Sequence, residues 1–246
     1  QETIRGAVID ILGWLDAREA IPYLWYPAFD SNQPEGVRTS AKKALAKLLK
    51  GSSERINRLS SVEAANELRR LAKTYYRKID ALPANDEGNV VLWTWNDEIE
   101  TVAEHTYLPT IASLMISSRF ARQALALSPD QPEPQRQYLG SLLGLEVLRT
   151  GWDRPRLMTP NSAMYLAMTA GEATISQVLS EALEAGQSAT AVASLEVLGQ
   201  IGSREQLLSQ RGLKSPVLAA LNSPDSRVQF AAATTVLKLD PKSGFL

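Results

Sequence analysis

The sequence predicts an all-α protein in which antiparallel helix pairs stack on one another. Ala and Leu, two strong helix formers, number 31 and 34 and together make up about a quarter of the 246 residues. Apolar residues recur at three- and four-residue steps over several segments, which is the pattern of a helix face. Similar segments return every 33–38 residues. Since one helix pair cannot bury its apolar face without a neighbour, this spacing predicts an α-solenoid.

The first 50 residues predict three helices. Residues 3–15 carry a stripe formed by Ile4, Ala7, Val8, Ile11, Leu12 and Leu15. Asp16 and Glu19 have the spacing of a capping box at the start of a second helix, which runs to about residue 28. Residues 31–34 are a breaker cluster. The helical period then restarts over 35–49 and ends before Gly51.

The middle of the chain predicts long helices over 60–81, 109–127 and 135–149, with a less helical stretch before the second. The turn signal Gly88-Asn89 is followed by the β-forming residues 90–95, which predict a short β segment. Asn96 is followed by two acidic residues, which the helix dipole favours in a first turn. We therefore expect a further helix over 97–105.

Composition excludes several classes of site. Without cysteine there is no disulfide scaffold, thiolate metal site or cysteine nucleophile, and one histidine excludes multi-histidine metal sites. No apolar run reaches the ~18–20 residues of a membrane span. No nucleophile motif or phosphate-binding glycine loop is present. We expect no catalytic residues, no metal and no cofactor, and a net charge of −1 argues against a dedicated nucleic-acid binder.

Four segments share one pattern: Ile4-Arg5-Gly6-Ala7, Val37-Arg38-Thr39-Ser40-Ala41, residues 191–199, and residues 228–237 after the turn Asn222-Ser223-Pro224-Asp225. They resemble HEAT repeats, the two-helix units of armadillo-like α-solenoids. The resemblance implies that Arg5 and Arg38 hydrogen-bond the turn between two helices. The last segment departs from the pattern, because Gln229 stands where the family carries its arginine.

Residues 121–130, followed by Pro132-Glu133-Pro134 and a new helix, look like the junction of two tetratricopeptide repeats. Ala121 replaces the usual aromatic residue, so the resemblance is to a degenerate repeat. It implies three parts: HEAT-like helices over 1–50, a tetratricopeptide-like insert over 51–155, and HEAT-like repeats over 156–246.

Charge is distributed unevenly. Residues 35–80 contain 12 Lys and Arg against 5 acids, whereas residues 81–105 contain 6 acids and no Lys or Arg. The basic residues 38–78 could attract nucleic acid or an acidic protein. The interpretation we favour is a solvated face that the adjacent acids partly neutralise.

Aromatic residues gather around the irregular segment. We expect Trp93, Trp95 and Tyr76 to anchor a protein or peptide partner, because aromatic residues supply much of the energy of interfaces. Arg69, Arg70, Arg77 and Lys78 would supply complementary charge. The competing interpretation, which we favour for the aromatic cluster as a whole, is that it seals the junction between the insert and the first helices. Three further tryptophans are predicted as core or cap residues: Trp14, Trp25 and Trp152.

Two other groups of residues could indicate a catalytic or metal site, but a structural role explains them more simply. Glu100, Glu104 and His105 could bind a metal or transfer a proton, but a solvated helix face, with His105 partly buried, is the interpretation we favour. Some HEAT-like proteins are DNA glycosylases that use Trp and Asp. Only Trp152-Asp153 and the Trp95, Asp97 pair invite that comparison, and neither lies in a matching motif.

The function expected is therefore a non-enzymatic helical-repeat scaffold that presents a concave surface to a protein or peptide. Two alternatives stay open. One is a nucleic-acid-binding or glycosylase-like solenoid that uses the basic residues 38–78. The other is a structural arm of a larger multidomain protein, because the residues after 239 look like the start of another repeat.

Overall fold

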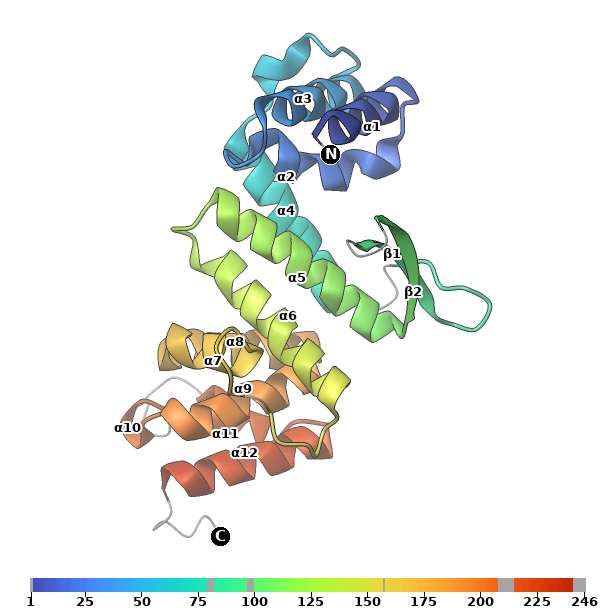
Figure 1. Ribbon diagram of the computed structural model, residues 1–246. Coiled ribbons are helices and arrows are strands. Elements are labelled where there is room, and N and C mark those ends of the chain that lie inside the picture. Colours follow the sequence, from blue (N-terminus) through green and yellow to red (C-terminus); the bar gives the residue numbers. More distant parts are fainter. Residues whose placement is uncertain (1, 79–81, 97–99, 157, 208–214, 241–246) are drawn as a thin grey trace. The chain divides into compact units, whose positions relative to one another are not determined.

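The computed structural model describes the chain except for residues 1, 79–81, 97–99, 157, 208–214 and 241–246. It is mostly helical and contains a small two-stranded sheet (Figure 1). This confirms the helical class and the short β segment. The chain forms two compact units, Gln1–Lys73 with Arg119–Gln135, and Thr74–Ser118 with Arg136–Leu246. The three-part division by repeat family stays a prediction.

The first unit is organised around helix α3 (Glu35–Lys50), against which α1 (Glu2–Trp14) and α2 (Ile21–Phe29) both pack. Helix α3 ends as predicted at Gly51, whose φ of 73° is the left-handed conformation that favours glycine at helix ends. The turn η2 (Arg55–Arg58) follows and leads to α4 (Ser61–Arg77). Residue 78 lies outside α4, so this helix is shorter than predicted.

Helix α1 turns a different face to the core than its apolar stripe predicts. Ile4 and Leu15 are 68% and 61% exposed, whereas Ile9 is 8% exposed. The buried face includes Gly13, where an added Cβ would lie 3.0 Å from the Cβ of Ala44 in α3. Because a glycine lets two helices approach closely, its position rather than the aliphatic stripe fixes which face meets α3.

The predicted capping box before the second helix does not form. Asp16 has a left-handed φ of 53°, and the short turn η1 (Arg18–Ala20) precedes α2 without a side-chain cap. The two tryptophans of this region behave differently. Trp25 is 3% exposed and belongs to the core as predicted, but Trp14 is 76% exposed and does not.

One carboxylate holds the turn between α2 and α3. Asp30 accepts hydrogen bonds from the backbone N–H of Asn32 at 3.0 Å and from Nε2 of Gln33 at 2.9 Å. Oε1 of Gln33 accepts one from Arg5 at 3.0 Å, so Arg5 contacts this turn. Burial by itself raises the pKa of Asp30, but these bonds and one from Tyr26 outweigh it, and the pKa is lower than 3.8.

The second unit contains the sheet, an antiparallel pair of β1 (Val90–Asn96) and β2 (Thr101–Tyr107). The predicted helix over 97–105 is therefore wrong for 101–105, and 97–99 lie outside the described residues. The acids after Asn96 suggested a helix start. The β-forming residues of 101–107 instead complete a ladder with β1, in which Val90 lies opposite Tyr107 and Asn96 opposite Thr101.

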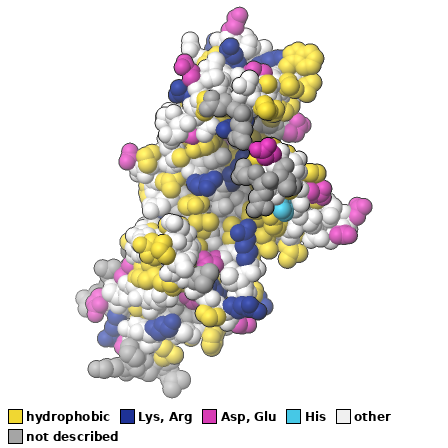
Figure 2. Space-filling view, viewed as in Figure 1, with side chains coloured by type: hydrophobic (Ala, Val, Ile, Leu, Met, Phe, Trp, Pro, Cys, Tyr) yellow, Lys and Arg dark blue, Asp and Glu magenta, His cyan; other side chains and the backbone are white. Residues whose placement is uncertain are grey.

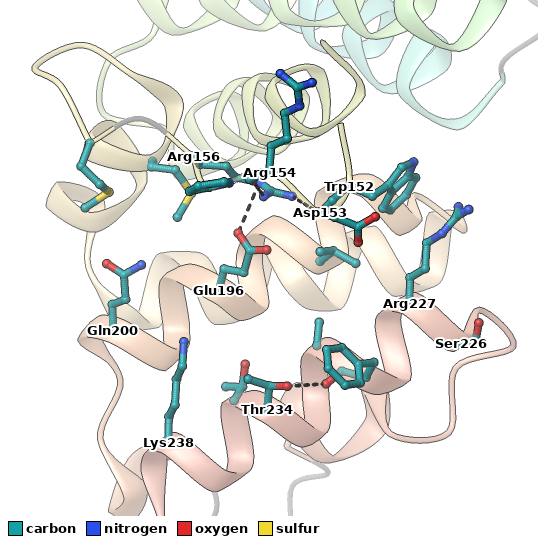
Figure 3. A pocket seen from close by; sticks show the side chains of 17 residues that line it. Trp152, Asp153, Arg154, Arg156, Glu196, Gln200, Ser226, Arg227, Thr234 and Lys238 are labelled. Carbon is teal, nitrogen blue, oxygen red and sulfur yellow. Dashed lines mark hydrogen bonds and ion pairs between the residues drawn. The ribbon is translucent and has the colours of Figure 1, made fainter. Parts of the chain in front are cut away.

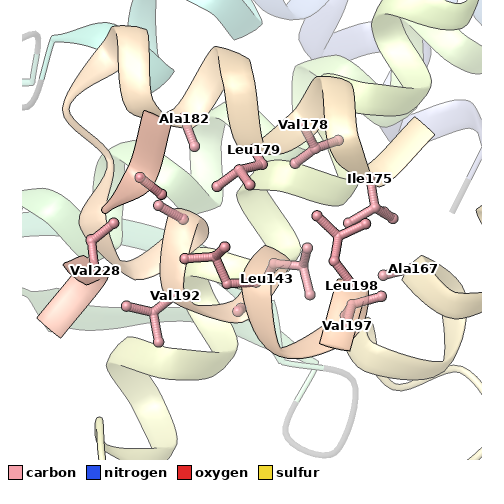
Figure 4. Packing of buried hydrophobic residues seen from close by; sticks show 14 of the residues in the cluster. Leu143, Ala167, Ile175, Val178, Leu179, Ala182, Val192, Val197, Leu198 and Val228 are labelled. Carbon is pink, nitrogen blue, oxygen red and sulfur yellow. The ribbon is translucent and has the colours of Figure 1, made fainter. Parts of the chain in front are cut away.

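Helices α5 (Pro109–Leu127) and α6 (Pro132–Thr150) are shared by the two units, because Arg119–Gln135 belongs to the first. The helices that lie wholly in the second unit are α7 (Ala163–Ala170), α8 (Glu172–Ala185), α9 (Ser188–Ile201), α10 (Arg204–Leu207), α11 (Pro216–Ala220) and α12 (Ser226–Leu239). Helix α9 packs against α7, α8 and α12, and α11 packs against α8 and α12. Consequently α9 is apolar on most of its surface, and residues such as Leu195 and Leu198 are fully buried among Leu143, Ile175 and Leu179 (Figure 4).

Two glycines of α6 make room for polar contacts inside this core. An added Cβ on Gly140 would lie 3.3 Å from the Tyr76 hydroxyl, and one on Gly144 would lie 2.6 Å from Oγ1 of Thr190. Thr190, on α9, donates a hydrogen bond to the carbonyl of Gly140 at 2.9 Å. Gln187 donates to the carbonyl of Tyr76 at 2.6 Å. The close approach of α6 and α9 therefore depends on the absence of side chains at these two positions.

Candidate binding groove

An open pocket of about 850 Å³ lies in the second unit, between the loop that follows α6 and the helices α9 and α12 (Figure 3). This volume is within the range of ordinary ligand-binding clefts. Aromatic, sulfur-containing and basic side chains provide most of its distinctive lining: Trp152, Arg154, Arg156, Met158, Met164, Arg227, Phe230 and Lys238. We call this pocket the C-terminal groove.

Its apolar surface is accessible to a ligand. Phe230 of α12 is 75% exposed, and Met158 of the loop is 45% exposed. Trp152 supports the guanidinium of Arg227, which lies 4.5 Å from the centre of the indole ring. Such a contact holds the cation in place while leaving its other face open to solvent. Figure 3 shows the Trp152 and Arg227 side chains next to each other at one end of the groove.

Arg156 holds the loop that follows α6, which forms one wall of the groove, against α9. Its side chain is 4% exposed, and Nε lies 3.3 Å from Oε2 of Glu196 on α9. Nη1 donates to the carbonyl of Arg154 at 2.9 Å, and Nη2 donates to the carbonyl of Trp152 at 3.4 Å. One side chain therefore connects α9 to the loop that carries Trp152. Because Arg is planar and always charged, it can make these three contacts at once.

Glu196 is the acidic residue on the α9 side of the groove. Burial raises its pKa above the ordinary value of 4.5, and Glu146 acts in the same direction. Arg156 and Lys238 oppose that rise, because a nearby cation favours the charged form of the carboxylate. The lining contains four basic side chains against the acids Asp153 and Glu196, which leaves the groove with a positive balance.

The residues at the start of α12 determine which side chains of this helix border the groove. Asp225 is the N-cap of α12, and its carboxylate accepts a hydrogen bond from the backbone N–H of Arg227 at 2.9 Å. A side-chain hydrogen bond from Ser188, the largest cause, lowers the pKa of Asp225 below 3.8. The cap starts the helix so that Arg227 and Phe230, three residues apart, share the face that borders the groove.

The aromatic residues predicted as partner anchors are not all at the surface. Trp93 and Trp95 are 63% and 54% exposed on β1, which leaves both accessible. Tyr76 is 3% exposed and lies in a small cluster with Leu114 and Leu145, so it is not available to a partner. Burial raises the pKa of the Tyr76 hydroxyl.

The predicted basic partners make ion pairs with acids of their own unit. Arg69 pairs with Glu133 and also hydrogen-bonds Asn66. Arg70 pairs with Glu67 at 2.9 Å. Arg77 lies 4.0 Å from Glu184, and Lys78 is exposed. The partial neutralisation expected from the sequence is present for these arginines, but the acids are not those of 86–104.

The candidate metal ligands lie on a strand rather than on a helix. Glu104 and His105 are neighbours on β2 and are both exposed, and Glu100 has a left-handed φ of 47° in the turn before it. Successive residues of a strand point to opposite faces, so these side chains diverge. Within the described part of the chain, no group of three acidic or histidine side chains could hold a metal ion.

Comparisons with known proteins give no relative: the chain matches no protein-family model, no curated protein and no solved structure significantly. Of the helices in the described residues, none combines the length and the apolar character needed to cross a membrane.

Sequence reasoning missed the groove because its lining comes from three segments far apart in the chain. The sequence suggests Trp152 as a core or cap residue and Trp152-Asp153 as a pair comparable to that of glycosylases, and it gives no sign that the neighbouring Arg154-Pro155-Arg156 forms a wall of a pocket. The sequence of α12 does contain one indication that an aromatic side chain is exposed there. Phe230 follows the buried Val228 by two positions, so on a helix it cannot share the core face.

Proposed function

We propose that this chain is a non-enzymatic helical-repeat scaffold that binds an acidic, aromatic-containing protein segment in the C-terminal groove. The observation that carries the proposal is the combination of Phe230, 75% exposed, with Arg227 supported on Trp152 in one open groove. Large exposed apolar side chains beside organised cations are characteristic of interface hot spots.

Chemistry and shape both favour a peptide as the ligand. The groove is open rather than enclosed, and its wall offers aromatic side chains and the exposed Met158, on which apolar residues can pack. Its positive balance favours carboxylates on the ligand. The helix pairs α8 with α9 and α11 with α12 would hold the two walls at a fixed separation, as stacked repeats do.

The alternative of a nucleic-acid site on residues 38–78 receives less support. Arg69, Arg70 and Arg77 each pair with a glutamate of their own unit. Lys42 lies 5.2 Å from the centre of the Phe29 ring, so part of its charge is also engaged. A phosphate backbone would have to compete with these contacts.

Fluorescence anisotropy tests the proposal with two labelled seven-residue peptides, Glu-Glu-Trp-Glu-Trp-Glu-Glu and its counterpart with Lys for every Glu. The acidic peptide should bind in the μM range, and the basic one at least tenfold more weakly. Phe230→Ala should weaken binding by about tenfold or more, because burying a phenylalanine contributes about 1.5–3 kcal/mol and every ~1.4 kcal/mol is a factor of ten.

The matched control is Trp14→Ala, which removes an equally exposed aromatic from the first unit and should leave binding unchanged. Equal binding of the two peptides, or equal loss in both variants, contradicts the proposal. The same assay with a labelled single-stranded oligonucleotide tests the nucleic-acid alternative. Tight binding that Lys42→Glu with Lys43→Glu abolishes, and that Phe230→Ala does not change, overturns the proposal in favour of the nucleic-acid alternative.

A further inference from the structure

The outer face of the hairpin is a second surface with exposed aromatic residues. Trp93 lies opposite Glu104 and Trp95 opposite Val102, so these four side chains share one face of the sheet. Trp93, Trp95 and Val102 are 63%, 54% and 50% exposed. The other face starts with Val90, which is 1% exposed and packs inward. Two-stranded hairpins are marginal alone, and this one is anchored on one face only.

The charge of the hairpin region is opposite to that of the groove. Residues 84–107 contain six acids and neither Lys nor Arg. Acidic side chains are visible in this region of the surface in Figure 2. The hairpin thus combines tryptophans with carboxylates, which is the chemistry that Arg227, Lys238 and Phe230 of the groove would recognise.

We propose that the outer hairpin face of one copy of this chain occupies the C-terminal groove of a second copy. This inference rests on the proposed function and names the ligand of the groove. Trp93 and Trp95 are exposed within their own chain, so each copy offers an accessible outer hairpin face and an accessible groove at the same time. The contact joins two different surfaces and is therefore heterologous, which generates a ring or an open chain of copies.

In such a contact the indoles pack beside Phe230 and Trp152, and the hairpin carboxylates face Arg227 and Lys238. Aromatic anchors in the centre of an interface contribute most of its affinity, and the surrounding charges set the orientation. Because part of the attraction is between exposed charges, salt should weaken the association.

Sedimentation velocity on the full chain tests this arrangement through two double variants. The hairpin variant carries Trp93→Ser and Trp95→Ser, and the groove variant carries Arg227→Glu and Phe230→Ser. Wild type should form dimers and larger species as its concentration rises over about 1–100 μM. Each variant alone should stay monomeric over this range. An equimolar mixture should form a 1:1 complex and nothing larger, because it contains one intact hairpin and one intact groove.

A wild-type chain that stays monomeric overturns the inference. So does a mixture that stays monomeric while wild type associates, since that result indicates a symmetric contact between like surfaces. Circular dichroism checks that both variants keep the helical content of wild type. The hairpin variant also separates the two proposals: if it still binds the acidic peptide while wild type does not self-associate, the groove function stands and only its assigned partner is wrong.

Discussion

Replacing Arg156 by Met should release the loop wall of the C-terminal groove. Met fills a similar volume without charge, so the substitution removes the two hydrogen bonds to the carbonyls of Arg154 and Trp152. It also removes one of the two cations beside the half-buried carboxylate of Glu196, so that only Lys238 still favours its charged form. Hydrogen bonds from charged donors contribute about 1.5–3 kcal/mol. One of these is long at 3.4 Å, so we expect a total loss of about 2–3 kcal/mol.

Urea unfolding measures this loss, and a double-mutant cycle assigns it. Glu196→Gln should be less destabilising than Arg156→Met, and the two together should differ from their sum by about 1 kcal/mol, because they share one ion pair. Arg18→Met is the control, since its side chain is 71% exposed and its ion pair with Asp16 spans 3.7 Å. Its effect should stay within about 0.5 kcal/mol. If Arg156→Met is no more destabilising than this control, the loop does not depend on Arg156.

Three further substitutions test the packing of α6 against α9 and the N-cap of α12. Gly144→Ala should destabilise by about 1–3 kcal/mol, because the new Cβ would lie 2.6 Å from Oγ1 of Thr190. Gly36→Ala has nothing within 4 Å and should raise the thermal midpoint slightly, so equal midpoints for the two variants would contradict the packing account. For Asp225→Asn, thermal unfolding should show lower stability than wild type at neutral pH. The pKa of Asp225 is lowered, first by Ser188, so its contribution is present above pH 3.8 and is lost as the pH falls through the lower folded-state pKa. The two midpoints should therefore converge below pH 3.8, and a constant difference across that range would exclude the charged cap.

Local signals predict most helices well. The helix bounds Pro109–Leu127 and the end of α3 at Gly51 follow from proline, glycine and the apolar period. The same signals fail at 101–105, where acids after Asn96 look like a helix start. There the ladder between β1 and β2 decides the conformation, and that pairing is not visible in a short window of sequence.

Predicting a buried face is harder than predicting a helix. In α1 the aliphatic stripe that includes Ile4 and Leu15 is exposed, because the close approach of Gly13 to Ala44 fixes the packed face. Tyr76 shows the opposite case, since a residue that suggests a binding surface is buried against α6. Both results depend on tertiary neighbours.

The C-terminal groove shows most clearly that sequence patterns do not reveal features that depend on tertiary packing. Trp152, Glu196 and Phe230 are separated by more than 30 residues each, and only the packing of α9 against α12 brings their segments together. The two tryptophans of β1, by contrast, stand out in the sequence as a candidate binding surface because they are neighbours in the chain. A site assembled from distant segments leaves no such local pattern.

Hydrogen–deuterium exchange with and without the acidic peptide tests the central claim most directly, because it locates the ligand. Bound peptide should slow exchange in residues 152–156 and in the first turns of α12, and Phe230→Ala should remove that protection. Protection that appears instead around α3 or β1, with the loop and α12 unchanged, would contradict the assignment of the C-terminal groove as the binding site.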